Sequence, residues 1–363
     1  MPRDPKSETL HLRGARSFVA GRFETAAREA FDDGWTPEEA DARELQTSVT
    51  VERARSIVSH NDSPDVGFTQ SINPYRGCEH GCIYCYARPS HAYLELSPGL
   101  DFETRLFAKT NAAELLRAEL ARPGYAPSPI AIGANTDCYQ PIERKYRITR
   151  EVLEVLAETD HPCTLVTKSA LVERDLDLLG PMAKKNLVKV FVSIGTLDRE
   201  LARKLEPRAA SPQRRLDVLR NLSKAGIPCG VMVAALIPAL NDKTMEHVLE
   251  AAAEAGAQEA AYVVMRLPNE LKTLFREWLQ EHYPQRAEHV MSIVQQMRGG
   301  RDNDPRFGTR MSGTGTFAGL LEKRFELACR RFNLNGHGSG RKAPALDCSR
   351  FRPPSPSGQG RLF

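Results

Sequence analysis

Three cysteines stand close together in the string GCEHGCIYCY, which covers residues 77–86. Cys78, Cys82 and Cys85 have the spacing C-x3-C-x2-C, and a glycine precedes each of the first two. Glycine allows the positive-φ turns with which a backbone wraps around a cluster. A [4Fe–4S] cluster takes four thiolates, so three cysteines leave one iron open to a small molecule. The spacing favours this cluster over structural zinc, which would have to recruit His80 from the same short loop.

The rest of the chain has the pattern of an α/β protein. From about residue 66, short apolar runs alternate with amphipathic stretches of helical period, which predicts βα units and a parallel sheet. The expected strands are Phe68–Ile72, Ile130–Ala134, Cys163–Thr167, Val188–Ile194, Cys229–Leu236 and Ala260–Met265. The expected helices lie near 111–121, 148–158, 171–184, 211–225, 242–255, 270–281 and 286–297. The pattern alone leaves a barrel and a doubly wound sheet open. A cysteine loop directly after the first strand favours the barrel, where active sites form at the carboxyl ends of the strands.

The cysteine spacing, with an aromatic residue before the last cysteine, resembles the radical S-adenosylmethionine (SAM) superfamily. Tyr84 and Tyr86 on either side of Cys85 make the loop similar to the spore photoproduct lyase-related, DNA repair photolyase-like group. The resemblance covers roughly residues 65–270 and implies a partial (β/α)6 barrel of the TIM type. It also implies a [4Fe–4S] cluster on the three cysteines and SAM on the open iron. Reductive cleavage of SAM would give a 5′-deoxyadenosyl radical, with electrons from a reductant such as flavodoxin or ferredoxin.

The same resemblance implies a set of SAM-binding residues at the strand ends. Tyr84 and Tyr86 would contact SAM, and Tyr86 would also relay a hydrogen atom. Most of the superfamily carries Gly-Gly-Glu after the second strand, where this chain has Gly133, Ala134 and then Asn135. The small residues still allow close backbone approach. Lys168 suits the SAM carboxylate and Ser193 suits the ribose diol.

Cys138 is a candidate hydrogen donor to the product radical. The donor cysteine of the related lyases aligns closer to Ala134, so a buried apolar thiol is the alternative for Cys138.

Four further charged residues have weaker assignments. Glu206 and Arg208 are expected to frame SAM or to form a solvated loop pair. Arg88 is expected to meet substrate or to lie exposed on the surface, and Arg266, at the end of the sixth strand, is expected to touch substrate.

Charge and terminal sequence suggest partners. Residues 299–363 carry 12 Lys and Arg against 5 Asp and Glu, whereas the remaining chain is slightly acidic. This basic end fits contact with DNA or another polyanion, or it is a solvated tail. The last five residues, Gln359-Gly360-Arg361-Leu362-Phe363, resemble the peptide that bacterial repair proteins insert into the sliding clamp. No run of 18 apolar residues and no signal-like start occurs, so a cytoplasmic protein without membrane contact is expected.

The predicted organisation is an extension over 1–64, a radical SAM core over 65–298, and a C-terminal helix with a basic disordered tail over 299–363. The predicted function is radical SAM chemistry on a nucleic-acid lesion, as a lyase of the DNA photoproduct type. Modification of tRNA, a peptide or a small metabolite remains open, as does a non-catalytic Fe–S redox sensor.

Overall fold

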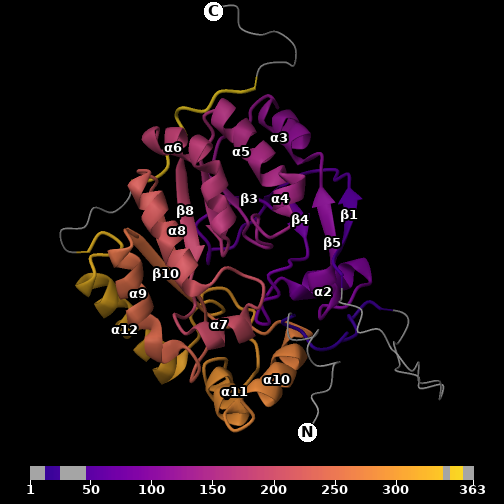
Figure 1. Ribbon diagram of the computed structural model, residues 1–363, viewed down its shortest axis with the longest axis vertical. Helices are drawn as coiled ribbons and strands as arrows, with labels where there is room; N and C mark the ends of the chain where they lie inside the picture. Colours follow the sequence, from indigo (N-terminus) through magenta and orange to yellow (C-terminus); the bar gives the residue numbers. More distant parts are fainter. Residues whose placement is uncertain (1–12, 25–45, 338–343, 355–363) are drawn as a thin grey trace, which may run out of the picture.

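The computed structural model describes residues 13–24, 46–337 and 344–354, and its centre is a seven-stranded sheet (Figure 1). The strand order is β10-β9-β8-β7-β6-β3-β2, and all neighbours are parallel except the edge pair β2–β3. The strands are β2 (Val58–His60), β3 (Gln70–Ile72), β6 (Ile130–Ile132), β7 (Cys163–Thr167), β8 (Val188–Ser193), β9 (Cys229–Leu236) and β10 (Glu259–Val264). The six parallel strands are those that the sequence predicted, so the partial (β/α)6 barrel is confirmed.

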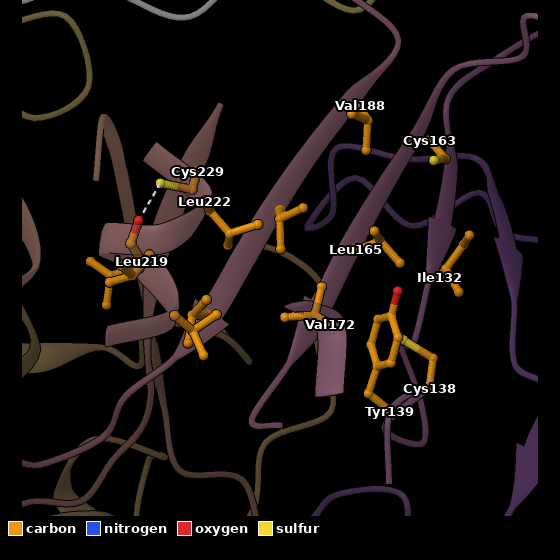
Figure 2. Packing of buried hydrophobic residues seen from close by; sticks show 14 of the residues in the cluster. Ile132, Cys138, Tyr139, Cys163, Leu165, Val172, Val188, Leu219, Leu222 and Cys229 are labelled. Atoms are coloured by element: carbon orange, nitrogen blue, oxygen red, sulfur yellow. Dashed lines mark hydrogen bonds between the residues drawn. The ribbon is translucent and has the colours of Figure 1, made fainter. Parts of the chain in front are cut away.

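The helices between these strands surround the sheet (Figure 1). They are α3 (Ala112–Leu120), α5 (Ile148–Glu158), α6 (Leu176–Lys184) after the 3-10 turn η2 (Ala170–Asp175), α8 (Pro212–Lys224) and α9 (Met245–Glu254) after η3 (Asp242–Thr244). In α8, the Ser211 side chain accepts the backbone N–H of Arg214 and Pro212 occupies the first turn, which is a strong start signal. Leu219 and Leu222 of this helix belong to the buried cluster that also contains strand residues such as Val188 (Figure 2).

A second, three-stranded sheet was not predicted. Its order is β1-β5-β4, with β1 (Ser48–Glu52), β5 (Arg105–Lys109) and β4 (Tyr75–Arg76). The cysteine loop runs from the end of β4 to η1 (Arg88–Leu94), and α2 (Asp101–Thr104) precedes β5. The extra sheet therefore holds both ends of the segment that carries the cysteines. Strands β1 and β2 come from the predicted N-terminal extension and pair with strands of the core.

The remaining helices are α4 (Glu143–Tyr146), α7 (Arg199–Leu205), α10 (Leu271–His282), α11 (Ala287–Gln296) and α12 (Gly315–Arg331). Arg324 of α12 pairs with Glu246 of α9 at 2.7 Å, so the predicted C-terminal helix packs on the barrel. None of the helices in the described ranges has both the length and the apolar character needed to span a membrane.

The segment after α12 was expected to be irregular or disordered. Its described parts are 332–337 and 344–354, and they contain no helix or strand, but 344–354 packs on the core. The Phe351 ring lies 5.4 Å from Tyr125 and 5.3 Å from His161 between ring centroids. The backbone N–H of Asp347 donates to Asn186 O at 2.9 Å. The clamp-like pentapeptide, residues 359–363, lies outside the described residues and stays a prediction.

Candidate functional site

The cysteine loop is a tight turn that glycine makes feasible. Gly77 has φ +73°, and a Cβ there would come within 2.8 Å of Phe102 O. Cys78 next to it donates its backbone N–H to the same carbonyl at 2.9 Å. Cys78 and Cys82 are each 7% exposed, whereas Cys85 is more open. The loop thus presents three thiols from one short segment at the edge of the core.

The electrostatics of the thiols fit a bound cluster. Burial raises the pKa of Cys82 to about 12, and burial raises the pKa of Cys78 well above its usual value, with the charges of Asp137 and the other cysteines adding to the effect. Three thiolates are costly here without a metal to neutralise them.

The positions of the cysteines also indicate which kind of metal group the loop can bind. Within the described ranges, no three His, Cys, Asp or Glu side chains converge closely enough for one metal ion. A cluster does not need that convergence, because each thiolate binds a different iron. His80, the only zinc alternative within the loop, has its Nδ1 3.2 Å from Asp137 Oδ2.

A buried arginine stabilises the backbone of the cysteine loop. Arg88 is 0% exposed, and its guanidinium donates to the carbonyls of Cys82 at 2.9 Å and Gly81 at 3.1 Å. It also pairs with the buried Glu103 and donates to Gly99 O at 2.9 Å. Arg88 is therefore neither exposed nor a substrate ligand, and both sequence interpretations of it are wrong.

Residues 13–15 of the extension lie against the same loop, and sequence analysis missed this contact. The backbone N–H groups of Gly14 and Ala15 donate to Glu103 Oε2 at 3.0 Å and Oε1 at 2.8 Å. Arg13 donates to Glu103 O at 3.0 Å. A Cβ on Gly14 would lie 1.7 Å from Gly81 O, so only glycine fits. We call residues 13–15 the N-terminal strap.

The carboxyl ends of β6 and β7 meet the cysteine loop at Asp137. Its carboxylate accepts the backbone N–H of Lys168 at 2.7 Å and the Thr167 hydroxyl at 2.8 Å. Burial would raise the pKa of Asp137, but His80 and Lys168 outweigh it and hold the pKa well below its usual value. Asp137 is therefore a buried anion that joins the loop to both strand ends.

The segment that replaces Gly-Gly-Glu lies next to the loop. Gly133 has φ +82°, and a Cβ there would lie 2.7 Å from Val166 O. Ala134 O accepts the hydroxyl of Tyr86. This contact brings two predicted SAM-binding positions from separate elements together.

The other predicted residues form a second group around Ala234 O in β9. The Ser193 hydroxyl donates to this carbonyl at 3.2 Å and the Tyr84 hydroxyl at 3.5 Å. Tyr84 also donates to Glu206, and Lys168 Nζ lies 5.8 Å from the centroid of the Tyr84 ring. Burial alone would lower the pKa of Lys168, but Cys82 and Glu206 outweigh it and raise the pKa.

Glu206 and Arg208 both face the loop, and neither is part of a solvated pair. Glu206 is 5% exposed and forms an ion pair with the buried Arg215, which donates to Ser193 O at 2.9 Å. Arg208 forms an ion pair with Glu79 of the loop at 3.1 Å. Arg215 had no signal in the sequence, because it lies in the middle of a helix that reads as an ordinary amphipathic one.

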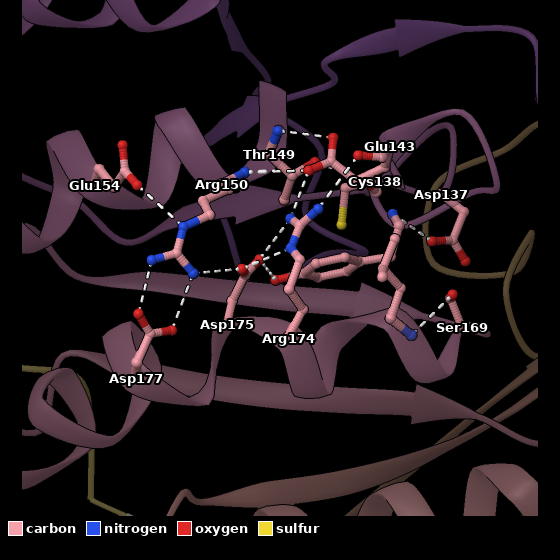
Figure 3. Close-up of polar contacts among 12 residues, drawn as sticks. Asp137, Cys138, Glu143, Thr149, Arg150, Glu154, Ser169, Arg174, Asp175 and Asp177 are labelled. Carbon is pink, nitrogen blue, oxygen red and sulfur yellow. Dashed lines mark hydrogen bonds and ion pairs between the residues drawn. The ribbon is translucent and has the colours of Figure 1, made fainter. Parts of the chain in front are cut away.

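Cys138 lies in the core. It is 0% exposed and packs near Ile132, Tyr139 and Leu165 (Figure 2). Its backbone carbonyl accepts the Thr149 hydroxyl at 2.6 Å, and Asp175 accepts the neighbouring Tyr139 hydroxyl at 3.0 Å. An ion-pair network of Glu143, Arg150, Arg174, Asp175 and Asp177 braces this turn (Figure 3). The burial favours the apolar-thiol interpretation, and the donor role stays a prediction.

Comparison with known proteins identifies the family. A model of the radical SAM superfamily matches residues 72–252, which include all three loop cysteines. The chain belongs to the radical SAM superfamily. Members of this superfamily use a [4Fe–4S] cluster and SAM and need a reductant. Spore photoproduct lyase complexed with dinucleoside spore photoproduct has a similar fold, with TM-score 0.58 at 17% identity over 81% of this chain and 82% of that one.

Two further relatives have a higher sequence identity to this chain than spore photoproduct lyase has. A protein of Mycobacterium tuberculosis described as uncharacterized is 38% identical over 220 residues, which are 60% of this radical SAM chain. The match spans 65% of that relative. An uncharacterized protein of Methanocaldococcus jannaschii is 27% identical over 246 residues, which cover 68% of this chain and 88% of that protein.

Proposed function

We propose that Cys78, Cys82 and Cys85 hold a [4Fe–4S] cluster and that SAM binds beside it at the carboxyl ends of β6, β7, β8 and β9. When bound, the cluster and SAM supply a 5′-deoxyadenosyl radical by reductive cleavage. The observation that carries this proposal is the position of Lys168. Its ammonium lies over the Tyr84 ring of the cysteine loop, 5.8 Å from the ring centroid, and Lys168 directly follows the last residue of β7.

The roles of the chain's own residues follow from their chemistry. Lys168 offers a point charge for the SAM carboxylate, and the carbonyl of Ala134 accepts from the SAM ammonium. Ser193 offers a hydroxyl to the ribose diol. Tyr84 is 8% exposed, donates a hydrogen bond to Glu206 and lies between the cysteine loop and β9. The ion pair of Glu206 with Arg215 fixes the position of Tyr84, because both ions are buried and each neutralises the other.

For the substrate, we propose a nucleic-acid lesion, which the enzyme would process as a lyase. The similar fold of spore photoproduct lyase supports this assignment, as does the basic charge of residues 299–363. A base would have to leave its stack to reach the end of the barrel. Electrons would come from a carrier such as flavodoxin or ferredoxin.

The test is anaerobic reconstitution followed by SAM and dithionite, with 5′-deoxyadenosine measured by mass spectrometry. Ultraviolet-irradiated DNA, undamaged DNA, tRNA and no added substrate are compared. We expect deoxyadenosine in excess with irradiated DNA, and repaired nucleotides in its digest. Cys82→Ala should lose the cluster absorbance and the product while the barrel stays folded, because none of the three loop cysteines belongs to the larger buried cluster around the sheet.

Equal deoxyadenosine in all four samples would remove the lesion assignment and leave radical SAM chemistry on another substrate. A loaded cluster that never yields deoxyadenosine with any of them would contradict the enzyme and favour a redox sensor.

A further inference from the structure

Arg266 is the second residue after β10 and lies near the cysteine loop. It is half-buried, and in the described part of the chain its guanidinium makes no hydrogen bond or ion pair. Its guanidinium carbon lies 4.6 Å from the centroid of the Tyr86 ring. Burial and the nearby charge of Arg310 lower the pKa of Arg266, and they outweigh Tyr86 and Asp65, which raise it. An anion bound to this half-buried guanidinium would form charge-assisted hydrogen bonds with it.

A second arginine, Arg310, lies against the exposed ring of Phe307. Phe307 is 57% exposed, and the guanidinium carbon of Arg310 lies 4.5 Å from its ring centroid. Arg310 itself is neutralised, because it pairs with Asp65, which also accepts the backbone N–H of Gly308 at 2.6 Å. Asp65 therefore fixes both the arginine that contacts the Phe307 ring and the backbone next to Phe307.

A buried arginine ties this loop to Arg266. Arg298 is 1% exposed and donates to Arg310 O at 2.9 Å and to Met265 O at 2.9 Å. It also donates to Thr309 O at 2.9 Å. One side chain therefore fixes the loop of Phe307 against the residue that precedes Arg266, so the two are preorganised relative to each other.

These groups lie beside the cysteine loop. Tyr86 follows Cys85 directly and is 44% exposed. Burial raises the pKa of Tyr86, and the charges of Arg266, Lys168 and Arg310 act in the opposite direction. An anion bound to Arg266 would thus be next to the site where the proposed radical forms.

We propose that Arg266 and Phe307 form a strand-binding subsite that takes a phosphate and an adjacent base of the nucleic-acid substrate. Proteins that bind single-stranded nucleic acid combine basic groups on the phosphates with aromatic platforms for the bases. Arg266 supplies the first and the exposed Phe307 ring supplies the second. An acidic peptide would satisfy Arg266 but would leave the ring without a flat partner. The subsite deepens the proposed function and rests on it for the identity of the substrate.

The experiment measures binding without turnover. The full chain, reconstituted anaerobically and kept without reductant, is titrated against a fluorescein-labelled oligothymidylate of about 12 nucleotides, and anisotropy is recorded at several salt concentrations. Arg266→Gln should weaken binding about tenfold and reduce the slope of log K against log salt by about 0.7. Phe307→Ala should weaken binding at least about fivefold with the slope unchanged, and Phe307→Trp should restore it.

The matched control is Arg117→Gln. Arg117 is an exposed residue of α3 that pairs with Glu158, and its replacement should change neither affinity nor slope. The subsite is overturned if Arg266→Gln and Phe307→Ala bind like the wild type while remaining folded, or if the wild type does not bind the oligonucleotide. It is also overturned if polyglutamate of equal charge displaces the oligonucleotide as well as unlabelled oligothymidylate does.

Failure of the subsite is distinguishable from failure of the proposed function. Lesion-dependent deoxyadenosine with unaltered binding by the variants sinks only the subsite. Binding that depends on Arg266 and Phe307, with no deoxyadenosine from any nucleic acid, supports the subsite and sinks the lesion enzyme.

Discussion

Replacement of Arg88 by methionine tests whether the buried ion pair behind the cysteine loop determines the loop's stability. Arg88 and Glu103 are both 0% exposed, and the change leaves Glu103 as an uncompensated buried anion. It also removes the donors to Cys82 O and Gly81 O. Removing one partner of a buried pair costs about 3–5 kcal/mol. The N–H groups of Gly14 and Ala15 still bond Glu103, so we expect the lower half of that range, about 3–4 kcal/mol.

Two measurements check this value on the apo protein. Urea denaturation gives the free energy of unfolding, and hydrogen exchange of the peptide around residues 76–90 gives the stability of the loop itself. The control is Arg117→Met, whose exposed pair is worth about 0–1 kcal/mol. The double variant Arg88→Met with Glu103→Leu should recover part of the loss, because no buried charge remains. A loss below about 1 kcal/mol by both measurements, equal to that of the control, would refute the reasoning.

Three further predictions concern the N-terminal strap, the binding of SAM and the loss of stability at low pH. Gly14→Ala places a Cβ 1.7 Å from a loop carbonyl, so the reconstituted variant should retain less iron per chain than Gly319→Ala, whose added methyl meets nothing within 4 Å. Lys168→Met should raise the dissociation constant for SAM at least about tenfold in equilibrium dialysis, and Lys168→Arg should recover part of it. Burial lowers the pKa of His91 and His161 to about 4, below the unfolded value near 6.5. Between these values the unfolded chain binds more protons, so stability should fall as pH drops, by about 2 kcal/mol per histidine at pH 5. Urea midpoints from pH 7 to pH 4.5 check this, and His161→Phe should flatten the curve.

The barrel was predictable because its signals are local. Each core strand, for example Cys163–Thr167, is a short apolar run between two helices, and the run and the helix period can be counted without knowing any contact. The cysteine motif was equally easy to recognise, because all three cysteines lie within eight residues of sequence. Lys168 and Ser193 were predicted from the family resemblance and from their place at strand ends. Lys168 lies over the Tyr84 ring, and Ser193 shares the Ala234 carbonyl with Tyr84. Their role in SAM binding stays a prediction.

The second sheet was missed for a physical reason. Strand β4 has only two residues, and β1 pairs in parallel with β5 across more than fifty residues of chain. Strand β1 has no buried residue, so the alternation that marks a strand is weak in it. Strand β5 alternates, with Leu106 and Ala108 buried, but it has only five residues. Such pairings depend on what the rest of the fold brings beside them, which the sequence of the strand itself does not contain.

The N-terminal strap shows what a single sequence hides at the site itself. Residues 13–16 read as Arg-Gly-Ala-Arg, a string with the composition of a surface loop. Its glycine is required only because Gly81, 67 positions later, places a carbonyl where a Cβ would be. The carboxylate that binds the strap, Glu103, is also the partner of Arg88, which in turn binds the loop carbonyls. Strap, carboxylate and arginine are therefore one buried polar network, in which each member satisfies the next and none is stable alone. Because the cysteine loop closes this network, the N-terminal strap is part of the proposed cluster site rather than an appendage to the barrel.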